Sequence, residues 1–126
     1  KKLNIPVGKI YASPTCRTIE TAQLAFGRVD FVDNNLYVHS FNVGTKESRA
    51  NAKRKALDII NAIPEERKNK IIVAHGKMLN LLGWHNSNIE ESGLFIVKHN
   101  QSEKLSVVTE TNLGSLIYAM RVQNEH

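Results

Sequence analysis

The chain has 126 residues, 41% hydrophobic and 23% charged, with a formal net charge of +5 at pH 7. This length and composition suit one globular domain, and apolar runs of about five residues are too short to cross a membrane. The positive charge favours anionic partners in general but is not by itself a signature of nucleic-acid binding. A single cysteine, Cys16, excludes a disulfide within these residues.

The hydrophobic pattern predicts strands that alternate with helices. In chain order we expect a strand over 9–13, a helix over 14–26, an irregular stretch over 27–44, a helix over 46–63, a strand over 70–75, a helical segment near 77–83, and strands over 94–99 and 105–111. The stretch 113–122 is ambiguous. Alternating strands and helices indicate parallel pairing with helices on both faces of the sheet. The polar residues 100–103 between two β-rich runs predict an antiparallel hairpin near the C-terminus.

Residues that typically begin and end helices flank the first predicted helix. Ser13 suits the N-cap, Pro14 the first helical position and Gly27 the position just past the end. Its apolar face comprises Ile19, Ala22 and Phe26, broadened by Leu24 and Ala25. The second helix is expected to end before Pro64, because proline disfavours an α conformation in the residue before it.

The densest basic stretch lies on the second predicted helix and consists of Lys46, Arg49, Lys53, Arg54 and Lys55. The opposite face carries the apolar residues Ala52, Ala56, Ile59, Ile60 and Ile63. This pattern is typical of a solvated helix face. Surfaces that bind single-stranded nucleic acid combine basic with aromatic residues, and no aromatic residues are interleaved with these charges. We therefore expect no nucleic-acid partner.

Two short motifs follow predicted strands and carry the residues with the clearest chemistry. Ser-Pro-Thr-Cys-Arg-Thr (13–18) follows the first strand, and Val-Ala-His-Gly (73–76) ends the strand over 70–75. Carboxyl ends of parallel strands meet at one edge of a sheet, where ligands bind in open α/β folds. Arg17 and His75 would thus meet in an oxyanion site, unless Arg17 pairs with Glu20 and His75 only caps the next helix.

These motifs resemble those of the histidine phosphatases, the phosphoglycerate mutase-like superfamily. KIYASPTCRTIETAQLAFG resembles the segment that carries that family's second pocket arginine, and IIVAHGKMLNLLG the segment with its second pocket histidine. ESRANAKRKALDII fits the helix between them, and ESGLFIVKHNQSEKLSVVTE the later hairpin. The resemblance implies a three-layer α/β/α fold with a mostly parallel central sheet, a C-terminal antiparallel hairpin, and one domain over 1–126.

The resemblance also implies the activity and the roles of the residues. The family hydrolyses phosphomonoesters through a phosphohistidine intermediate, which divides one difficult step into two. His75 is then a catalytic residue beside the phosphate, and Arg17, Ser13 and Gly76 bind the phosphate. The implied partner is phosphate or a phosphorylated small molecule, with no cofactor and no metal. His39, His85 and His99 lie in different elements and show no metal-ligand spacing.

One departure from the family is decisive for activity. The nucleophile belongs to an Arg-His-Gly motif on the family's first strand, and this sequence contains no Arg-His pair. We interpret the chain as a fragment that lacks this first strand and the first helix, and we expect it to bind phosphate poorly and to hydrolyse nothing.

The general acid of the reaction, which protonates the leaving group, is also unassigned. Asp30, Asp33 and Glu47 are candidates, and none stands in a recognisable motif.

Three other readings of function remain open, one of them a basic nucleic-acid-binding domain that rests on charge alone, and a fourth is excluded. A non-catalytic phosphate-binding or interaction domain of the same fold would explain the missing nucleophile, and a phosphoglycerate mutase proper is less favoured because its specificity motifs are not evident. A cysteine phosphatase needs an arginine six residues after its nucleophile, but position 22 is Ala22, so we expect Cys16 to be an ordinary, at least half-buried thiol. Short family members with Ser-Pro-x-Cys-Arg-Thr often carry export signals, which favours an exported or periplasmic location.

Overall fold

The computed structural model of the chain describes residues 5–76, 78–79, 93–99 and 105–111. The chain divides into two compact units, one formed by 5–84 and the other by 1–4 with 85–126. We call the first the α/β unit and describe the two separately. The segment expected as a helix near 77–83 lies mostly outside the described residues, and the stretch 113–122 lies wholly outside them.

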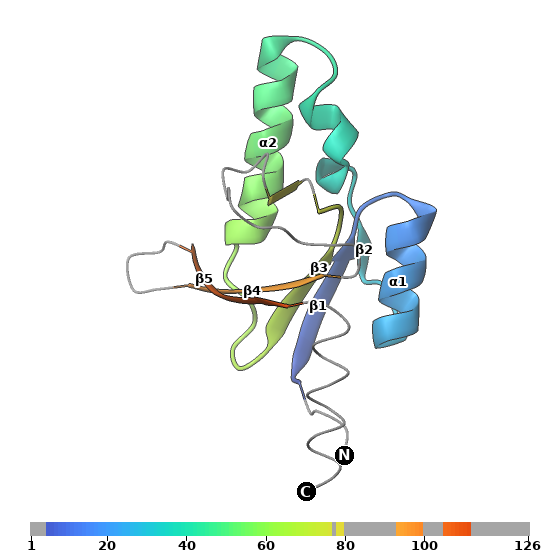
Figure 1. Ribbon diagram of the computed structural model, residues 1–126, viewed down its shortest axis with the longest axis vertical. Helices are drawn as coiled ribbons and strands as arrows, with labels where there is room; N and C mark the ends of the chain where they lie inside the picture. The colour runs from blue at the N-terminus through green and yellow to red at the C-terminus, as the bar shows by residue number, and fades with distance from the viewer. Residues whose placement is uncertain (1–4, 77, 80–92, 100–104, 112–126) are drawn as a thin grey trace, which may run out of the picture. The chain divides into compact units, whose positions relative to one another are not determined.

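The α/β unit is built on a three-stranded parallel sheet with strand order β2-β1-β3 (Figure 1). β1 (Val7–Ala12) lies in the middle, β2 (Phe31–Val32) on one side and β3 (Asn69–Val73) on the other. Ala12 is paired with Val32 and with Val73, so the carboxyl ends of the three strands are level. The expected parallel pairing of the two motif-bearing strands is confirmed.

Side-chain alternation along β1 produces the core of this unit. Ile10 and Ala12 are fully buried on one face, where they form a cluster with Ala22 of α1 (Cys16–Phe26). Partly buried apolar side chains complete the cluster: Val7, Ile19, Phe26, Val29, Ile71 and Val73. Burial of apolar area at about 25 cal/mol per Å² makes this cluster the main force that fixes α1 on the sheet.

The expected apolar face of α1 is confirmed in part. Ile19, Ala22 and Phe26 contribute to the core, but Leu24 is 89% exposed and Ala25 is exposed as well. The prediction that these two residues broaden the face is therefore wrong. Leu24 is two positions from both Ala22 and Phe26, so it lies outside the stripe spaced three and four residues apart that faces the sheet.

The two ends of α1 differ in how well the sequence predicted them. Gly27 ends the helix in the left-handed conformation (φ 77°), as expected of a C-terminal glycine. The N-cap is Thr15 rather than Ser13, and its hydroxyl accepts a hydrogen bond from the Thr18 amide. Ser13 still belongs to the sheet, because its N–H donates to the Val73 carbonyl at 3.1 Å. Pro14 therefore precedes the helix and does not begin it.

The second helix, α2 (Lys46–Asn61), packs against two short 3₁₀ helices, η1 (Asn34–Leu36) and η2 (Val38–Phe41). Leu36 and Phe41 of these turns are buried, as are Ala56 and Ile60 of α2. The helix ends two residues earlier than expected, and Ile63 is 80% exposed rather than part of the apolar face. β2, η1 and η2 all fall in the stretch expected to be irregular, since elements this short leave no periodic pattern.

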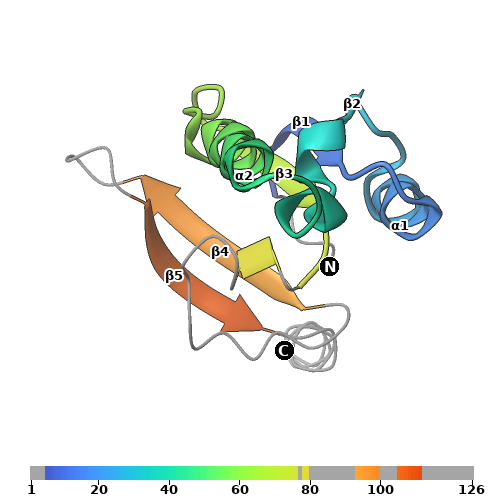
Figure 2. The ribbon, with the colours of Figure 1, turned by 90° about the horizontal axis from the view of Figure 1, so that it is seen from above.

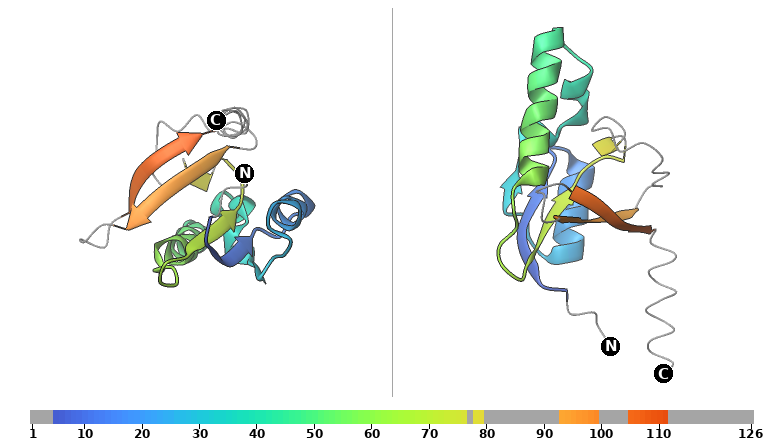
Figure 3. Two further views of the ribbon diagram at one scale, coloured as in Figure 1. Left: turned by 90° about the horizontal axis from the view of Figure 1, so that it is seen from below. Right: turned by 90° about the vertical axis from the view of Figure 1, so that its left-hand side faces the viewer.

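The carboxyl-terminal unit contains the expected antiparallel hairpin of β4 (Leu94–His99) and β5 (Leu105–Thr111), visible in Figures 2 and 3. Its pairing shifts register between Ile96 and Val97, as at a β-bulge. The described structure is thus a small mixed α/β protein with a three-stranded parallel sheet, two α-helices and a hairpin. No helix among the described residues has the length and apolar character needed to span a bilayer.

Candidate functional site

The strand order places a topological switch point between β1 and β3. The chain leaves β1 through α1 to reach β2 on one side, and leaves β2 through α2 to reach β3 on the other. In parallel α/β sheets, ligands bind in the crevice outside the carboxyl ends of the strands at such a point. The residues that follow β1 and β3 are Ser13 and, after Ala74, His75. The two motifs therefore meet where this topology favours a binding site.

A direct hydrogen bond joins the two motifs. Ser13 Oγ lies 3.1 Å from His75 Nε2, across 62 residues of sequence. Ser13 is fully buried and its Oγ also lies 2.9 Å from Thr18 Oγ1, whereas the His75 ring is half-buried. The contact fixes the imidazole at the end of β3 against the end of β1 and the first turn of α1.

Arg17 lies in the first turn of α1, close enough for its charge to act on His75. Burial and, second, the positive charge of Arg17 lower the pKa of His75 below its usual value of 6.5. The Arg17 side chain is exposed, and within the described residues it forms no ion pair, including none with Glu20. The alternative in which Arg17 pairs with Glu20 is therefore not what the structure has.

The backbone of this turn adds further donors. The first N–H groups of an α-helix have no partner within the helix, and they carry the positive end of the helix dipole. The Thr18 amide is satisfied by Thr15 Oγ1 at 3.4 Å, whereas no described residue accepts from the Cys16 or Arg17 amides. Free amides, a guanidinium and a histidine together form an arrangement suited to an oxyanion.

The other expected site residues have more modest surroundings. Gly76 is exposed next to His75, and its carbonyl accepts from the Leu79 amide at 3.4 Å. The His75 carbonyl accepts from the Met78 amide at 3.0 Å, so the backbone of His75 does begin the following turn. Cys16, the first residue of α1, is exposed, so the expectation of a thiol that is at least half-buried is wrong.

The three candidate acids have structural partners or lie elsewhere. Asp30 Oδ2 accepts from the Ile10 amide at 2.8 Å, and Asp33 Oδ1 accepts from the Asn35 amide at 2.9 Å to cap η1. Glu47 is exposed in the first turn of α2. Asp33 is the one that directly follows the carboxyl end of β2, where its N–H donates to the Ala12 carbonyl. None is hydrogen-bonded to His75, and the general acid stays unassigned.

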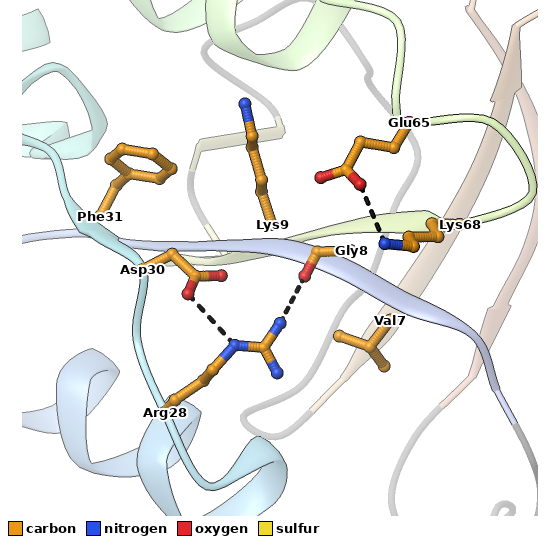
Figure 4. Close-up of a pocket in the computed structure, with 8 residues that line it drawn as sticks. All are labelled: Val7, Gly8, Lys9, Arg28, Asp30, Phe31, Glu65 and Lys68. Atoms are coloured by element: carbon orange, nitrogen blue, oxygen red, sulfur yellow. Dashed lines mark hydrogen bonds and ion pairs between the residues drawn. The ribbon is translucent and has the colours of Figure 1, made fainter.

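A second feature, which the sequence did not indicate, lies along β1 away from these motifs. A hollow of about 300 Å³ is lined by Val7, Gly8, Lys9, Arg28, Asp30, Phe31, Glu65 and Lys68. Figure 4 shows that most of its charges are paired with each other. Arg28 bonds Asp30 at 3.1 Å and the Gly8 carbonyl at 2.8 Å, and Lys68 bonds Glu65 at 3.0 Å. These contacts hold Arg28 against β1 and pair Lys68 with Glu65. Most of the charged groups of the hollow are therefore already neutralised and offer little charge to a ligand.

Metal ligands are not grouped in the described residues: no three or more His, Cys, Asp or Glu side chains are arranged to hold an ion. His39 lies in η2, and His85 lies outside the described residues.

Comparisons of the chain with protein-family models, with curated proteins and with solved structures find no match. The assignment of a function therefore depends on the geometry at the ends of β1 and β3.

Proposed function

We propose that the carboxyl edge of β1 and β3 is the phosphate-binding part of a histidine-phosphatase-like active site. The observation that carries this proposal is the meeting of Ser13, Arg17 and His75 at the switch point of the sheet. Arg17 is a guanidinium at a helix N-terminus with no ion-pair partner among the described residues, and burial together with its charge lowers the pKa of His75. The guanidinium and the helix N-terminus both favour a bound anion with several oxygen acceptors.

In this proposal the reaction is phosphomonoester hydrolysis through a phosphohistidine. The Arg17 guanidinium and the free amides of the first turn of α1 hold the phosphoryl oxygens. His75 stabilises the charge that develops on the phosphoryl group in the transition state. The nucleophilic histidine belongs to an Arg-His-Gly motif, which the printed sequence does not contain. The complete domain is three-layered, with the strand that carries this motif added to the sheet. The substrate class is a phosphorylated small molecule.

The first test uses the 126-residue chain itself. Inorganic phosphate should shift the NMR signals of the His75 ring and the Arg17 side chain saturably and with weak affinity, and Arg17→Ala should remove most of this response. Arg49→Ala on α2 is the matched control, since it removes the same charge from a different helix. A response that is equal in both variants would show that phosphate binds by general charge alone and would overturn the proposed site.

The second test concerns the nucleophile. The 126-residue chain should not hydrolyse 4-nitrophenyl phosphate, whereas a longer chain with an Arg-His-Gly motif ahead of residue 1 should do so and should trap acid-labile phosphate on that histidine. Hydrolysis by the short chain at a rate comparable to the longer one would contradict this mechanism. A full-length protein that binds phosphate at Arg17 and His75 but has no such motif would instead be a phosphate-binding domain without catalysis.

A further inference from the structure

Three hydroxyl groups lie between the end of β1 and the first turn of α1, and they contact one another. Thr18 Oγ1 is 2.9 Å from Ser13 Oγ and 2.8 Å from Thr15 Oγ1. The same oxygen is 2.7 Å from the Ser13 carbonyl and 3.0 Å from the Thr15 carbonyl. Ser13 is fully buried and Thr18 is 5% exposed, so these groups must satisfy each other. The hydroxyl of Ser13 is the one that also meets His75.

The hydroxyl hydrogens of this group can be arranged so that every one is used. The Thr18 hydroxyl donates to the carbonyls of Ser13 and Thr15, which can only accept. Its oxygen then offers a lone pair to Ser13 Oγ, and the Ser13 hydroxyl donates to it. In this arrangement Ser13 has a lone pair for the ring of His75, and Nε2 of His75 carries the hydrogen and donates it.

We propose that Ser13 and Thr18 are positioning residues that keep a hydrogen on His75 Nε2 and leave Nδ1 to meet a bound phosphate, so that binding of the anion adds a proton to His75. This inference rests on the proposed phosphate site and deepens it. It gives Ser13 an indirect role through His75, in place of the direct phosphate contact that the sequence pattern suggested.

The proton balance follows from the free nitrogen. Nδ1 of His75 makes no hydrogen bond to a described residue, and in the neutral ring fixed in this way it has a lone pair and no hydrogen. A phosphate dianion also has no hydrogen to share, so the two can bond only after Nδ1 is protonated. The proton comes from solvent or arrives on the phosphate monoanion, and either route gives the same complex of an imidazolium with a dianion.

The electrostatics of the site favour this exchange. Burial and the charge of Arg17 lower the pKa of His75, which favours the neutral ring at neutral pH. Arg17, from α1, is the charged group that acts on the ring among the described residues, and no described carboxylate is bonded to the ring. A dianion beside both groups would offset the repulsion between them and return a proton to His75.

The experiment measures which ring nitrogen carries hydrogen, by ¹⁵N NMR of the imidazole in the 126-residue chain without phosphate. We expect the hydrogen of the neutral wild-type ring on Nε2. Thr18→Val removes the acceptor of the Ser13 hydroxyl, which is then free to donate to Nε2, so the hydrogen should move to Nδ1. Thr21→Val is the matched control: the Thr21 hydroxyl donates to the Arg17 carbonyl at 2.7 Å on the exposed side of the same helix. It should leave the ring unchanged.

A second measurement follows phosphate affinity against pH. In the wild type, affinity should gain up to about an additional tenfold for each pH unit as the pH falls toward the pKa of His75, through the added proton. Thr18→Val should reduce this gain, because a ring with hydrogen on Nδ1 can donate without taking up a proton. The titration of phosphate itself is the same for both proteins, so the difference between their slopes reports on His75.

The outcomes separate the inference from the proposed function. A wild-type ring with its hydrogen on Nδ1 overturns the positioning role even if Thr18→Val does not fold, and so does a Thr18→Val chain that behaves like Thr21→Val. A ring that follows the expected pattern in a chain that does not respond to phosphate overturns the proposed function and leaves the positioning role standing. Equal pH slopes in wild type and Thr18→Val overturn the proton uptake.

Discussion

The parallel sheet of the α/β unit carries cations toward both ends, but they are used differently. On the amino-terminal side, Arg28 is held by Asp30 and by the Gly8 carbonyl, and Lys70 donates to the carbonyls of Ile59, Ile60 and Ala62 at the end of α2. On the carboxyl side, Arg17 has no ion-pair partner among the described residues, and after burial its charge is the second cause that lowers the pKa of His75. Among the described residues, Arg28 and Lys70 on the amino-terminal side thus have acceptors for their charge, whereas Arg17 on the carboxyl side has no ion-pair partner.

Helix polarity explains this difference. Unpaired carbonyls at a helix C-terminus accept from a cation, so Lys70 stabilises the end of α2. The N–H groups at a helix N-terminus repel a cation, so the first turn of α1 gives Arg17 no favourable partner, and none of the described residues supplies one. A positive side chain thus stabilises the helix end in one place, and in the other it lies where our proposal puts the phosphate.

The largest expected effect comes from removing each arginine in turn. Arg17→Ala should weaken phosphate binding by roughly tenfold to a hundredfold, the value of a charge-assisted hydrogen bond, with little change in stability. Arg28→Ala should leave phosphate binding unchanged and lower the free energy of unfolding. Phosphate titration and urea unfolding of both variants measure the two effects. Equal loss of phosphate affinity in both variants would contradict the functional separation of the two ends.

Lys70→Met tests the cation that caps α2. We expect it to lower the free energy of unfolding by about 1 kcal/mol, because it removes the hydrogen bonds to the helix carbonyls while the methionine side chain keeps the apolar contacts of the lysine stem. Lys55→Met on the exposed side of α2 is the control and should have little effect. Burial lowers the pKa of Lys70, and the cost of burying its charge subtracts from its contribution. A variant more stable than the wild type would show that burial outweighs the hydrogen bonds.

Asp30→Asn tests the carboxylate beside β1 through the pH dependence of stability. Its hydrogen bond from the Ile10 amide holds the pKa of Asp30 below its usual value of 3.8, with further help from Arg28. A pKa that is lower in the folded state contributes stability above pH 3.8, and this contribution is lost as the pH falls through the folded pKa. Unfolding measured from pH 6 to pH 2 should therefore be less acid-dependent in Asp30→Asn. Glu66→Gln, at a residue with a 91% exposed side chain, should keep the wild-type profile.

Cys16→Ser should have the smallest effect. The side chain is exposed at the start of α1, and the proposed chemistry uses its backbone amide and not its thiol. Phosphate affinity and stability should both stay within experimental error of the wild type, measured by the same titration and urea unfolding. A large loss of phosphate binding would show that the thiol itself contacts the anion.

The sequence predicted the two helices and the motif-bearing strands because these elements are long enough to show periodicity. It did not predict β2, η1 or η2, which have between two and four residues each. β2 is held by its pairing with β1, and η1 and η2 contact α2 and bury Leu36 and Phe41. It also placed the N-cap at Ser13. A serine before proline looks like a cap locally, but its pairing with Val73 is a long-range contact that no local pattern contains.

The candidate site divides in the same way. The sequence by itself determined that Arg17 and His75 follow strands whose carboxyl ends meet at one edge, since each strand and the turn after it is specified locally. Only the tertiary structure decided that the buried Ser13 hydroxyl contacts both His75 and Thr18, and that Arg17 has no carboxylate partner among the described residues. These features depend on the packing of β1, α1 and β3 against each other, and hydrogen-bond direction is fixed only when every neighbouring donor and acceptor is in place.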